Sequence, residues 1–132
     1  MAGEDFGSAR IVRLPDEIDV ATFGPAEAEL LTAVSVPGLV IADMTGTTCC
    51  DSTGMRMLLT VSERARSSGS TLRVAVRPGS SVARVMRILG VRRILSVYDS
   101  AADAQAASGL RRVRSRLPAG NPDPVAGSIM GR

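Results

Sequence analysis

The sequence predicts a single α/β domain, and three observations support this prediction. The chain has 132 residues, of which 45% are hydrophobic and 22% charged, a size and balance typical of one domain with its own core. Short apolar runs alternate along the chain with segments in which apolar residues recur every three or four positions. Such alternation indicates strands separated by helices, with right-handed crossovers wherever neighbouring strands run parallel.

The first half of the chain contains three predicted strands and one helix. Residues 10–14 form a β-type run that Pro15 ends, and residues 17–20 add a second short strand. Thr22 is expected to cap a helix that has Pro25 in its first turn, where a missing N–H costs little. Residues 39–42 are continuously apolar, which predicts a central strand covered on both faces. The apolar stripe of the helix consists of Phe23, Leu30, Leu31 and Val34.

The second half repeats the alternation. Residues 52–67 are predicted to form an amphipathic helix closed by Gly69, and residues 72–76 the next strand. A narrow apolar stripe beginning at Val82 predicts a helix that Gly90 ends, followed by a strand at 94–98. Ser100 is expected to cap an alanine-rich helix that extends through residue 107.

The charge is placed unevenly and divides the chain into three parts. Residues 1–9 form an N-terminal extension, 10–108 the domain, and 109–132 a tail that contains arginine and proline and is expected to be flexible. The tail has five arginines and one acid (+4), whereas residues 1–108 have eleven arginines and twelve acids (−1). The net charge of +3 is therefore a property of the tail. The arginine cluster at 111–116 could attract a phosphate backbone, but a solvated basic tail explains it equally, and no direct contact with nucleic acid is expected.

Several protein classes are excluded or disfavoured by composition. No apolar run approaches the ~20 residues that cross a bilayer, and residues 1–8 resemble no secretory signal. The two cysteines are adjacent and cannot form a disulfide framework, so a cytoplasmic location is expected. The chain has no histidine and no lysine, which removes the usual bases for a nucleophilic serine. Neither a metal site nor a cofactor is expected, because two thiols without histidine fall short of a zinc site.

The most informative segment is residues 43–54, DMTGTTCCDSTG, which joins the most apolar strand to the amphipathic helix. Ligands and partners of open α/β sheets usually bind at such junctions. Helix capping alone explains an aspartate, a serine and a glycine at this position. The segment has neither a Gly-x-Ser-x-Gly motif nor a phosphate-binding loop, so no catalytic residue is expected.

Ser52 could instead be a target of modification. A phosphoryl group there would add about −1.5 to −2 charges at a helix N-terminus, where the free N–H groups and the helix dipole tolerate negative charge. Asp51 and an acidic or apolar partner surface would not tolerate it. A small exposed hydroxyl could thus dock a partner when bare and repel it when modified.

These residues resemble the STAS domain, and in particular the bacterial anti-sigma factor antagonists. The resemblance extends from about residue 10 to residue 107. It rests on 14–19 (LPDEID), which resembles the family's early Gly-Glu-Leu/Ile-Asp segment, on Asp43 to Thr45 at the end of the central strand, and on 51–54 (DSTG) as the phosphorylation motif. Gly90 and Val91 fit the turn before the last strand. The segment at 14–19 has Pro15 and Asp16 in place of the usual glycine context.

The resemblance implies a single STAS-type domain with a mixed sheet of four or five strands flanked by about four helices. It also implies a function: the unphosphorylated protein binds an anti-sigma factor with a GHKL-type serine kinase fold and releases the sigma factor. Phosphorylation of Ser52 switches binding off, a phosphatase resets the switch, and Thr53 is a secondary phosphorylation candidate. The chain is then a kinase substrate and not an enzyme. The residues expected to contact the partner are Asp19, Asp43, Thr45, Asp51, Ser52, Thr53, Gly54, Arg56 and Met57.

Other interpretations remain at this stage. The chain could be a STAS interaction module that is never phosphorylated, in a stress-sensing or transport complex. Cys49 and Cys50 are expected to be apolar loop residues. Met57 lies at the edge of the helical stripe and could belong either to the core or to a partner surface, and Arg56 could pair with a partner or remain solvated.

Overall fold

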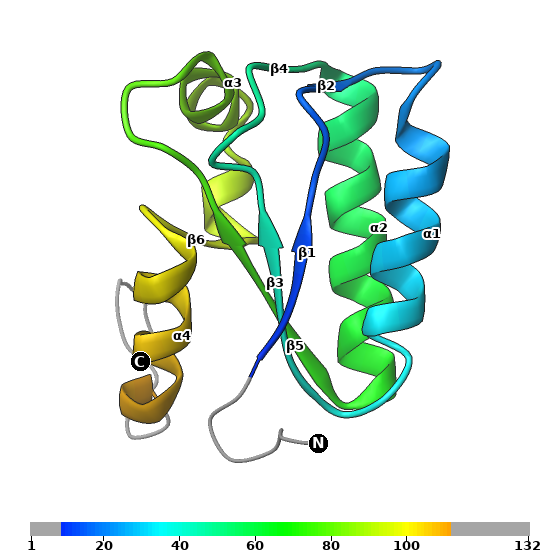
Figure 1. The fold of residues 1–132 in the computed structure, drawn as a ribbon, viewed down its shortest axis with the longest axis vertical. Helices are drawn as coiled ribbons and strands as arrows, with labels where there is room; N and C mark the ends of the chain where they lie inside the picture. The colour runs from blue at the N-terminus through cyan, green and yellow to red at the C-terminus, as the bar shows by residue number, and fades with distance from the viewer. Residues whose placement is uncertain (1–8, 112–132) are drawn as a thin grey trace.

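The computed structural model describes residues 9–111, and shows a sheet with helices on both faces (Figure 1). The N-terminal extension up to residue 8 and the tail from residue 112 onward, including most of the arginine cluster at 111–116, lie outside the described residues. The strands are β1 (Arg10–Arg13), β2 (Glu17–Ile18), β3 (Gly38–Asp43), β4 (Cys49–Cys50), β5 (Ser70–Ala75) and β6 (Ser96–Tyr98). The helices are α1 (Phe23–Ala33), α2 (Ser52–Ser68), α3 (Ser81–Leu89), the 3₁₀ turn η1 (Val91–Arg93) and α4 (Ala101–Arg111).

The main sheet has four strands in the order β1-β3-β5-β6. Its register pairs Ile11 with Ile41, Ile41 with Arg73, and Val74 with Val97. All pairs are parallel, because a helix lies on each connection between neighbouring strands of this sheet. The expected α/β fold with four helices is thereby confirmed, whereas the strand pairs within residues 9–111 show only parallel directions in place of the mixed ones that the resemblance implied.

The core lies mainly between the sheet and the pair α1 and α2, which cover one face (Figure 1). Leu30, Val40, Leu58, Val61 and Val74 are among its fully buried members. Helix α4 covers the opposite face, where Ala104 packs with Ile41 and Ala75 in a smaller cluster. The two buried faces explain why the central strand is apolar throughout.

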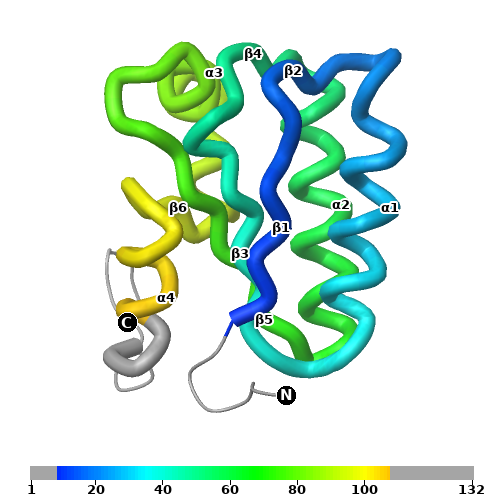
Figure 2. The backbone as a smooth tube through the Cα atoms, in the orientation of Figure 1, coloured from blue at the N-terminus to red at the C-terminus, as the bar shows by residue number. Residues whose placement is uncertain are grey.

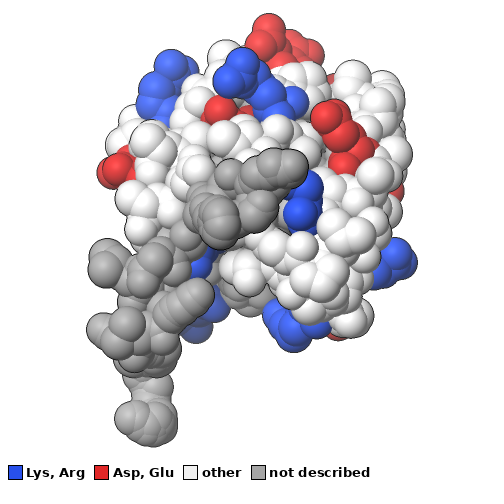
Figure 3. Space-filling view, turned by 60° about the horizontal axis from the view of Figure 1, so that its bottom comes forward, with Lys and Arg blue, Asp and Glu red and all other residues white. Residues whose placement is uncertain are grey.

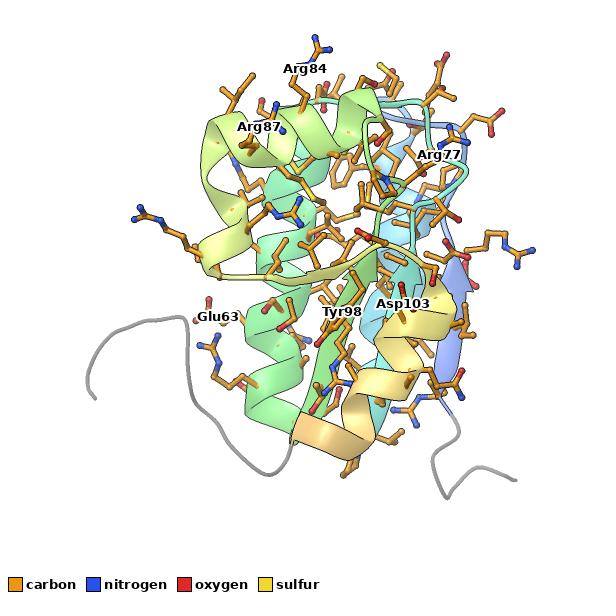
Figure 4. The ribbon with its side chains drawn as sticks, turned by 90° about the vertical axis from the view of Figure 1, so that its left-hand side faces the viewer. Glu63, Arg77, Arg84, Arg87, Tyr98 and Asp103 are labelled. Atoms are coloured by element: carbon orange, nitrogen blue, oxygen red, sulfur yellow. The ribbon has the colours of Figure 1, made fainter. Side chains whose placement is uncertain are left out.

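One charged side chain is buried beneath α4. Arg73 of β5 donates a hydrogen bond of 3.0 Å from Nη1 to the carbonyl of Ala104, and its guanidinium lies 5.7 Å from the ring centroid of Tyr98. Figure 4 views this face and shows Tyr98 beside α4, which carries Asp103. The arginine therefore ties α4 to the sheet.

The helix ends follow the expected chemistry in most cases. Gly69 and Gly90 end α2 and α3 in the left-handed conformation, with φ of 76° and 71°, which glycine adopts without steric cost. The Ser100 hydroxyl accepts the N–H of Asp103 at 3.0 Å and caps α4 as predicted. That helix continues to Arg111, beyond the expected end at residue 107.

Two local features differ from the sequence prediction. Cys49 and Cys50, expected in a loop, form β4, which pairs in parallel with β2 as a separate two-stranded sheet (Figure 2). The last strand begins at Ser96 and not at residue 94, because Ile94 and Leu95 still belong to the turn after η1, with N–H groups that donate to the carbonyl of Val91 at 2.9 and 2.8 Å. None of the helices described is long and apolar enough to span a membrane.

Candidate functional site

The candidate site is the N-terminus of α2, where β3, β4 and the helix meet at one end of the molecule (Figure 1). Ser52 is the first residue of α2, and its side chain is exposed. Its hydroxyl forms no hydrogen bond with another residue of the described chain. The oxygen is therefore both accessible and free to react or to be modified.

Asp51 holds the first turn of α2 in place. Its Oδ1 accepts the N–H of Thr53 at 2.9 Å and that of Gly54 at 3.2 Å, which are two of the donors a helix start leaves unpaired. Its own N–H donates to the carbonyl of Ile18 at 3.2 Å. Through these bonds Asp51 caps α2 and fixes the start of the helix against β2. Ser52, the next residue, is exposed.

Gly54 lies where α2 passes closest to the small sheet. It is buried, and a Cβ atom built there would overlap Cys50 Sγ and lie 2.9 Å from Cγ2 of Ile18. A side chain at position 54 would therefore push the helix away from β2 and β4. The glycine belongs to the packing beneath the site and does not itself contact a partner through a side chain.

Asp43 and Thr45 form a tight unit at the end of β3. Asp43 Oδ1 accepts the N–H of Thr45 at 3.0 Å and its hydroxyl at 2.7 Å, and Arg13 Nε lies 3.8 Å from Asp43 Oδ2. Asp43 is only 6% exposed, while Thr45 is half-buried. Of the two expected contact residues, Thr45 has the accessible surface, and Asp43 orients it.

Asp19 shapes the turn before α1, a role that the sequence analysis assigned to Thr22. Asp19 Oδ1 accepts the N–H groups of Ala21 at 2.9 Å and Thr22 at 3.1 Å. The Thr22 side chain caps no N–H of α1, and its hydroxyl instead accepts the N–H of Asp19 at 3.0 Å. The predicted Thr22 cap is wrong because the Thr22 hydroxyl is already hydrogen-bonded to Asp19, three residues earlier.

Arg56 and Met57 lie on different sides of α2. Arg56 is exposed and forms no ion pair with any other residue that the structure describes. Met57 is only 2% exposed and belongs to the main core. The expectation that Met57 contacts a partner is therefore corrected: Met57 lies within the buried face of α2 and not at its exposed edge.

The two cysteines differ in environment although they are adjacent. Cys49 is exposed, whereas Cys50 is buried against Gly54. Burial, with the charge of Asp51 and of Cys49, raises the pKa of the Cys50 thiol from 9.0 to about 12, so the thiol stays neutral and unreactive. No group of three or more metal-ligating side chains occurs within residues 9–111.

Two residues that support the site were not predicted from the sequence. Ile18 packs against Gly54, and Ser81 of α3 donates a 2.6 Å hydrogen bond to the carbonyl of Thr48, just before β4. The first could have been found from the apolar position in the strand at 17–20. The second had no signal, because a serine at a helix start does not indicate which loop it will reach.

Three solved structures share the fold of this chain. An anti-sigma factor antagonist from Mycobacterium paratuberculosis aligns with a TM-score of 0.65 and 23% identity over 79% of this chain and 88% of the other. A putative anti-sigma factor antagonist from Thermotoga maritima aligns with a TM-score of 0.59 and 17% identity, covering 73% and 85%. A sulfate transporter family protein from Wolinella succinogenes aligns with a TM-score of 0.62 and 22% identity, covering 80% and 88%.

The fold is therefore the one shared by these three proteins. The family model of the STAS domain matches residues 4–104. The chain belongs to the STAS domain family. No curated protein matches the chain.

Proposed function

We propose that the chain is an anti-sigma factor antagonist whose binding is switched by phosphorylation of Ser52. The unphosphorylated form binds an anti-sigma factor with a GHKL-type serine kinase fold, and the bound sigma factor is released. The kinase transfers the phosphoryl group from its own ATP to the Ser52 hydroxyl, and a serine phosphatase removes it. The chain supplies the hydroxyl and is not itself an enzyme. The setting is the cytoplasm.

The observation that carries this proposal is the exposed Ser52 hydroxyl at the first position of α2, without a hydrogen-bond partner among the described residues. A kinase can reach this oxygen without unfolding the chain. Phosphorylation breaks no hydrogen bond between this hydroxyl and the described residues, so the folded structure is expected to stay the same. Phosphorylation therefore changes only the charge and the size of the surface at Ser52.

The neighbourhood explains how a phosphoryl group would act. Thr53 and Gly54 have their N–H groups already bound to Asp51, so the helix start offers a phosphate fewer free donors than an uncapped one. The Asp51 carboxylate is next in sequence and would face a dianion. The phosphate is then directed outward into the contact with the partner, where it adds bulk and uncompensated charge.

The proposed contact surface consists of exposed and half-buried residues around this hydroxyl. Thr45, Thr53 and Arg56 have side chains accessible to a partner there. The backbone turn that Asp19 forms belongs to the same surface. Asp43, Asp51 and Gly54 contribute by positioning these groups. Thr53 is the secondary phosphorylation candidate, but it is half-buried and its backbone is held by Asp51.

The test begins with the partner. Ser52→Ala is used as bait in a native lysate, a captured anti-sigma factor is purified, and it is incubated with the wild-type chain and ATP. We expect one added phosphoryl group by mass spectrometry, lost in Ser52→Ala and retained in Thr53→Ala. Addition to Thr53 alone, or none at all, would contradict the proposal; the second result would favour a STAS module in a stress-sensing or transport complex.

Affinity provides the second measurement. In calorimetric titrations Ser52→Ala is expected to bind the purified partner as the wild type does, and Ser52→Asp at least tenfold more weakly, because each ~1.4 kcal/mol of penalty changes affinity tenfold. Thr60→Asp, at an exposed position of the same helix but away from its start, is the matched charge control. Equal affinities for Ser52→Ala and Ser52→Asp would count against the charge switch.

A further inference from the structure

Charged residues are sorted by sign along the chain. Residues 14–55 contain seven acidic residues and no arginine, whereas residues 56–98 contain nine arginines and a single acidic residue, Glu63. The mild overall charge therefore conceals two regions of opposite sign. The fold decides whether these regions neutralise each other within one molecule or lie apart on its surface.

The basic region reaches the surface on α3 and η1. Arg84, Arg87, Arg92 and Arg93 are all exposed, and Figure 4 shows Arg84 extending from α3 away from the body of the molecule. None of the four forms an ion pair or a side-chain hydrogen bond with another residue in the described part of the chain. We call this surface the basic face; its charge is not compensated by those residues.

The basic face also carries the largest exposed aliphatic side chains of the second half. Ile88 is 72% exposed, Ile94 58% and Leu89 49%. Isolated exposed aliphatic residues are ordinary, but three of them among four arginines form a mixed apolar and cationic surface. A nucleic-acid backbone would use the arginines alone. A protein surface with acidic and aliphatic side chains matches both features.

Such a surface exists on this same chain. Asp16, Glu17 and Glu29 are exposed on the segment from β2 to α1, with Asp19 between them. Val20, at 73%, is the most exposed large aliphatic residue described. We call this surface the acidic face. None of its carboxylates pairs with an arginine within residues 9–111.

The two faces cannot meet within one copy. Helix α3 and the start of α1 lie on opposite sides of the molecule, with β4 and β2 between them (Figure 1). On the part of the surface visible in Figure 3, by contrast, acidic and basic residues are interspersed.

We propose that the basic face of one copy docks against the acidic face of a second copy. The contact is heterologous, because it joins two different surfaces, so it repeats from copy to copy and forms head-to-tail chains or a closed ring. Arg84 and Arg87 face carboxylates of the segment at 16–29, and Ile88 and Val20 supply the apolar contact. This goes beyond the proposed function and does not require phosphorylation of Ser52.

Salt dependence follows from the charges. Exposed charges are screened over about 10 Å at 0.1 M ionic strength and about 3 Å at 1 M. We expect the weight-average mass in sedimentation equilibrium to rise with protein concentration at low ionic strength, and to return to that of the monomer in 1 M NaCl. A monomer mass at every concentration and ionic strength would overturn the proposal.

Charge reversal identifies the two faces. The full-length double variants Arg84→Glu/Arg87→Glu and Asp16→Arg/Glu17→Arg each retain one intact face and are expected to remain monomeric when alone. Mixed in equal amounts, they are expected to associate again, because the intact acidic face of the first variant meets the intact basic face of the second and the two reversed faces are also opposite in charge. Arg84→Lys/Arg87→Lys, which retains the charge, should associate as the wild type does.

Three outcomes would overturn the proposal. Undiminished association of Arg84→Glu/Arg87→Glu would place the contact elsewhere, for example on residues 112–132. A mixture that stays monomeric would show that the faces do not recognise each other. A wild-type mass that falls after nuclease treatment would assign the basic face to nucleic acid. Circular dichroism of each variant checks that a loss of association is not a loss of folding.

Discussion

The side chain of Cys50 occupies the space that a Cβ atom on Gly54 would need. Such an atom would overlap Cys50 Sγ and approach Cγ2 of Ile18 to 2.9 Å. Gly54 is not at a positive φ, so its backbone could accommodate any residue. The requirement for glycine comes from the close approach of α2 to the strands β2 and β4, and this approach sets where the first turn of the helix lies.

Gly54→Ala is therefore expected to destabilise the protein. Alanine favours a helix interior over glycine by about 1 kcal/mol, but here overpacking costs roughly 1–3 kcal/mol. We expect a net decrease in the free energy of unfolding, measured with urea. Cys50 and Ile18 lie on the paired strands β4 and β2 and cannot move freely away from the added methyl group.

Gly24→Ala is the matched control. Gly24 is also helical, in the first turn of α1, and a Cβ atom there would meet nothing within 4 Å outside its own turn and its chain neighbours. Pro25 follows it and disfavours helical backbone for a residue that has a Cβ, so this variant is expected to lose less stability than Gly54→Ala, and not to gain any. Similar destabilisation by both substitutions would show that the close approach at Gly54 is not what matters.

Much of this fold could be predicted because its signals are local. The apolar run of β3, the stripe of α2 and the glycines at 69 and 90 depend on residues within a few positions of each other. The position of Ser52 at the start of α2 follows from the same local signals, since the preceding Asp51 is a preferred N-cap residue.

The rest depends on contacts between distant segments. Nothing near Cys49 indicates that it pairs with Glu17, 32 residues earlier. Met57 is buried because strands and helices from distant parts of the chain form the main core together with α2. Thr22 failed as a cap for a different reason: its hydroxyl is used within the turn before α1, where it donates to Asp19 Oδ1 at 3.1 Å and accepts the N–H of Asp19 at 3.0 Å.

Asp51→Ala is expected to lower the free energy of unfolding by about 1 kcal/mol, the usual cost of losing an N-terminal cap. It removes the acceptor of the N–H groups of Thr53 and Gly54. Asp51→Asn keeps an oxygen in the same place and should lose only a few tenths of that. Thermal unfolding of both variants makes the comparison. A loss of stability in Asp51→Asn as large as that in Asp51→Ala would mean that the charge of Asp51, and not its hydrogen bonds, stabilises the helix start.

The buried Cys50 thiol predicts a loss of stability at alkaline pH. Its pKa is raised from 9.0 to about 12, chiefly because burial disfavours the thiolate. Below pH 9 the thiol is neutral in both states. Above pH 9 the unfolded chain ionises while the folded chain does not until about pH 12, so the free energy of unfolding falls across this window. One such group contributes at most about 1.4 kcal/mol per pH unit.

Urea unfolding between pH 8 and pH 10.5 measures this slope in the wild type, Cys49→Ala and Cys50→Ala. The charge of Cys49 is the smallest of the three causes that raise the Cys50 pKa, so Cys49→Ala should retain most of the slope, whereas Cys50→Ala should flatten it because the alanine has no proton to lose. All other residues are the same in the three proteins, so the comparison isolates the two cysteines. The same slope in Cys50→Ala as in the wild type would show that the alkaline loss arises elsewhere. Alkylation should follow the same order, with Cys49 modified in the folded protein and Cys50 only after unfolding.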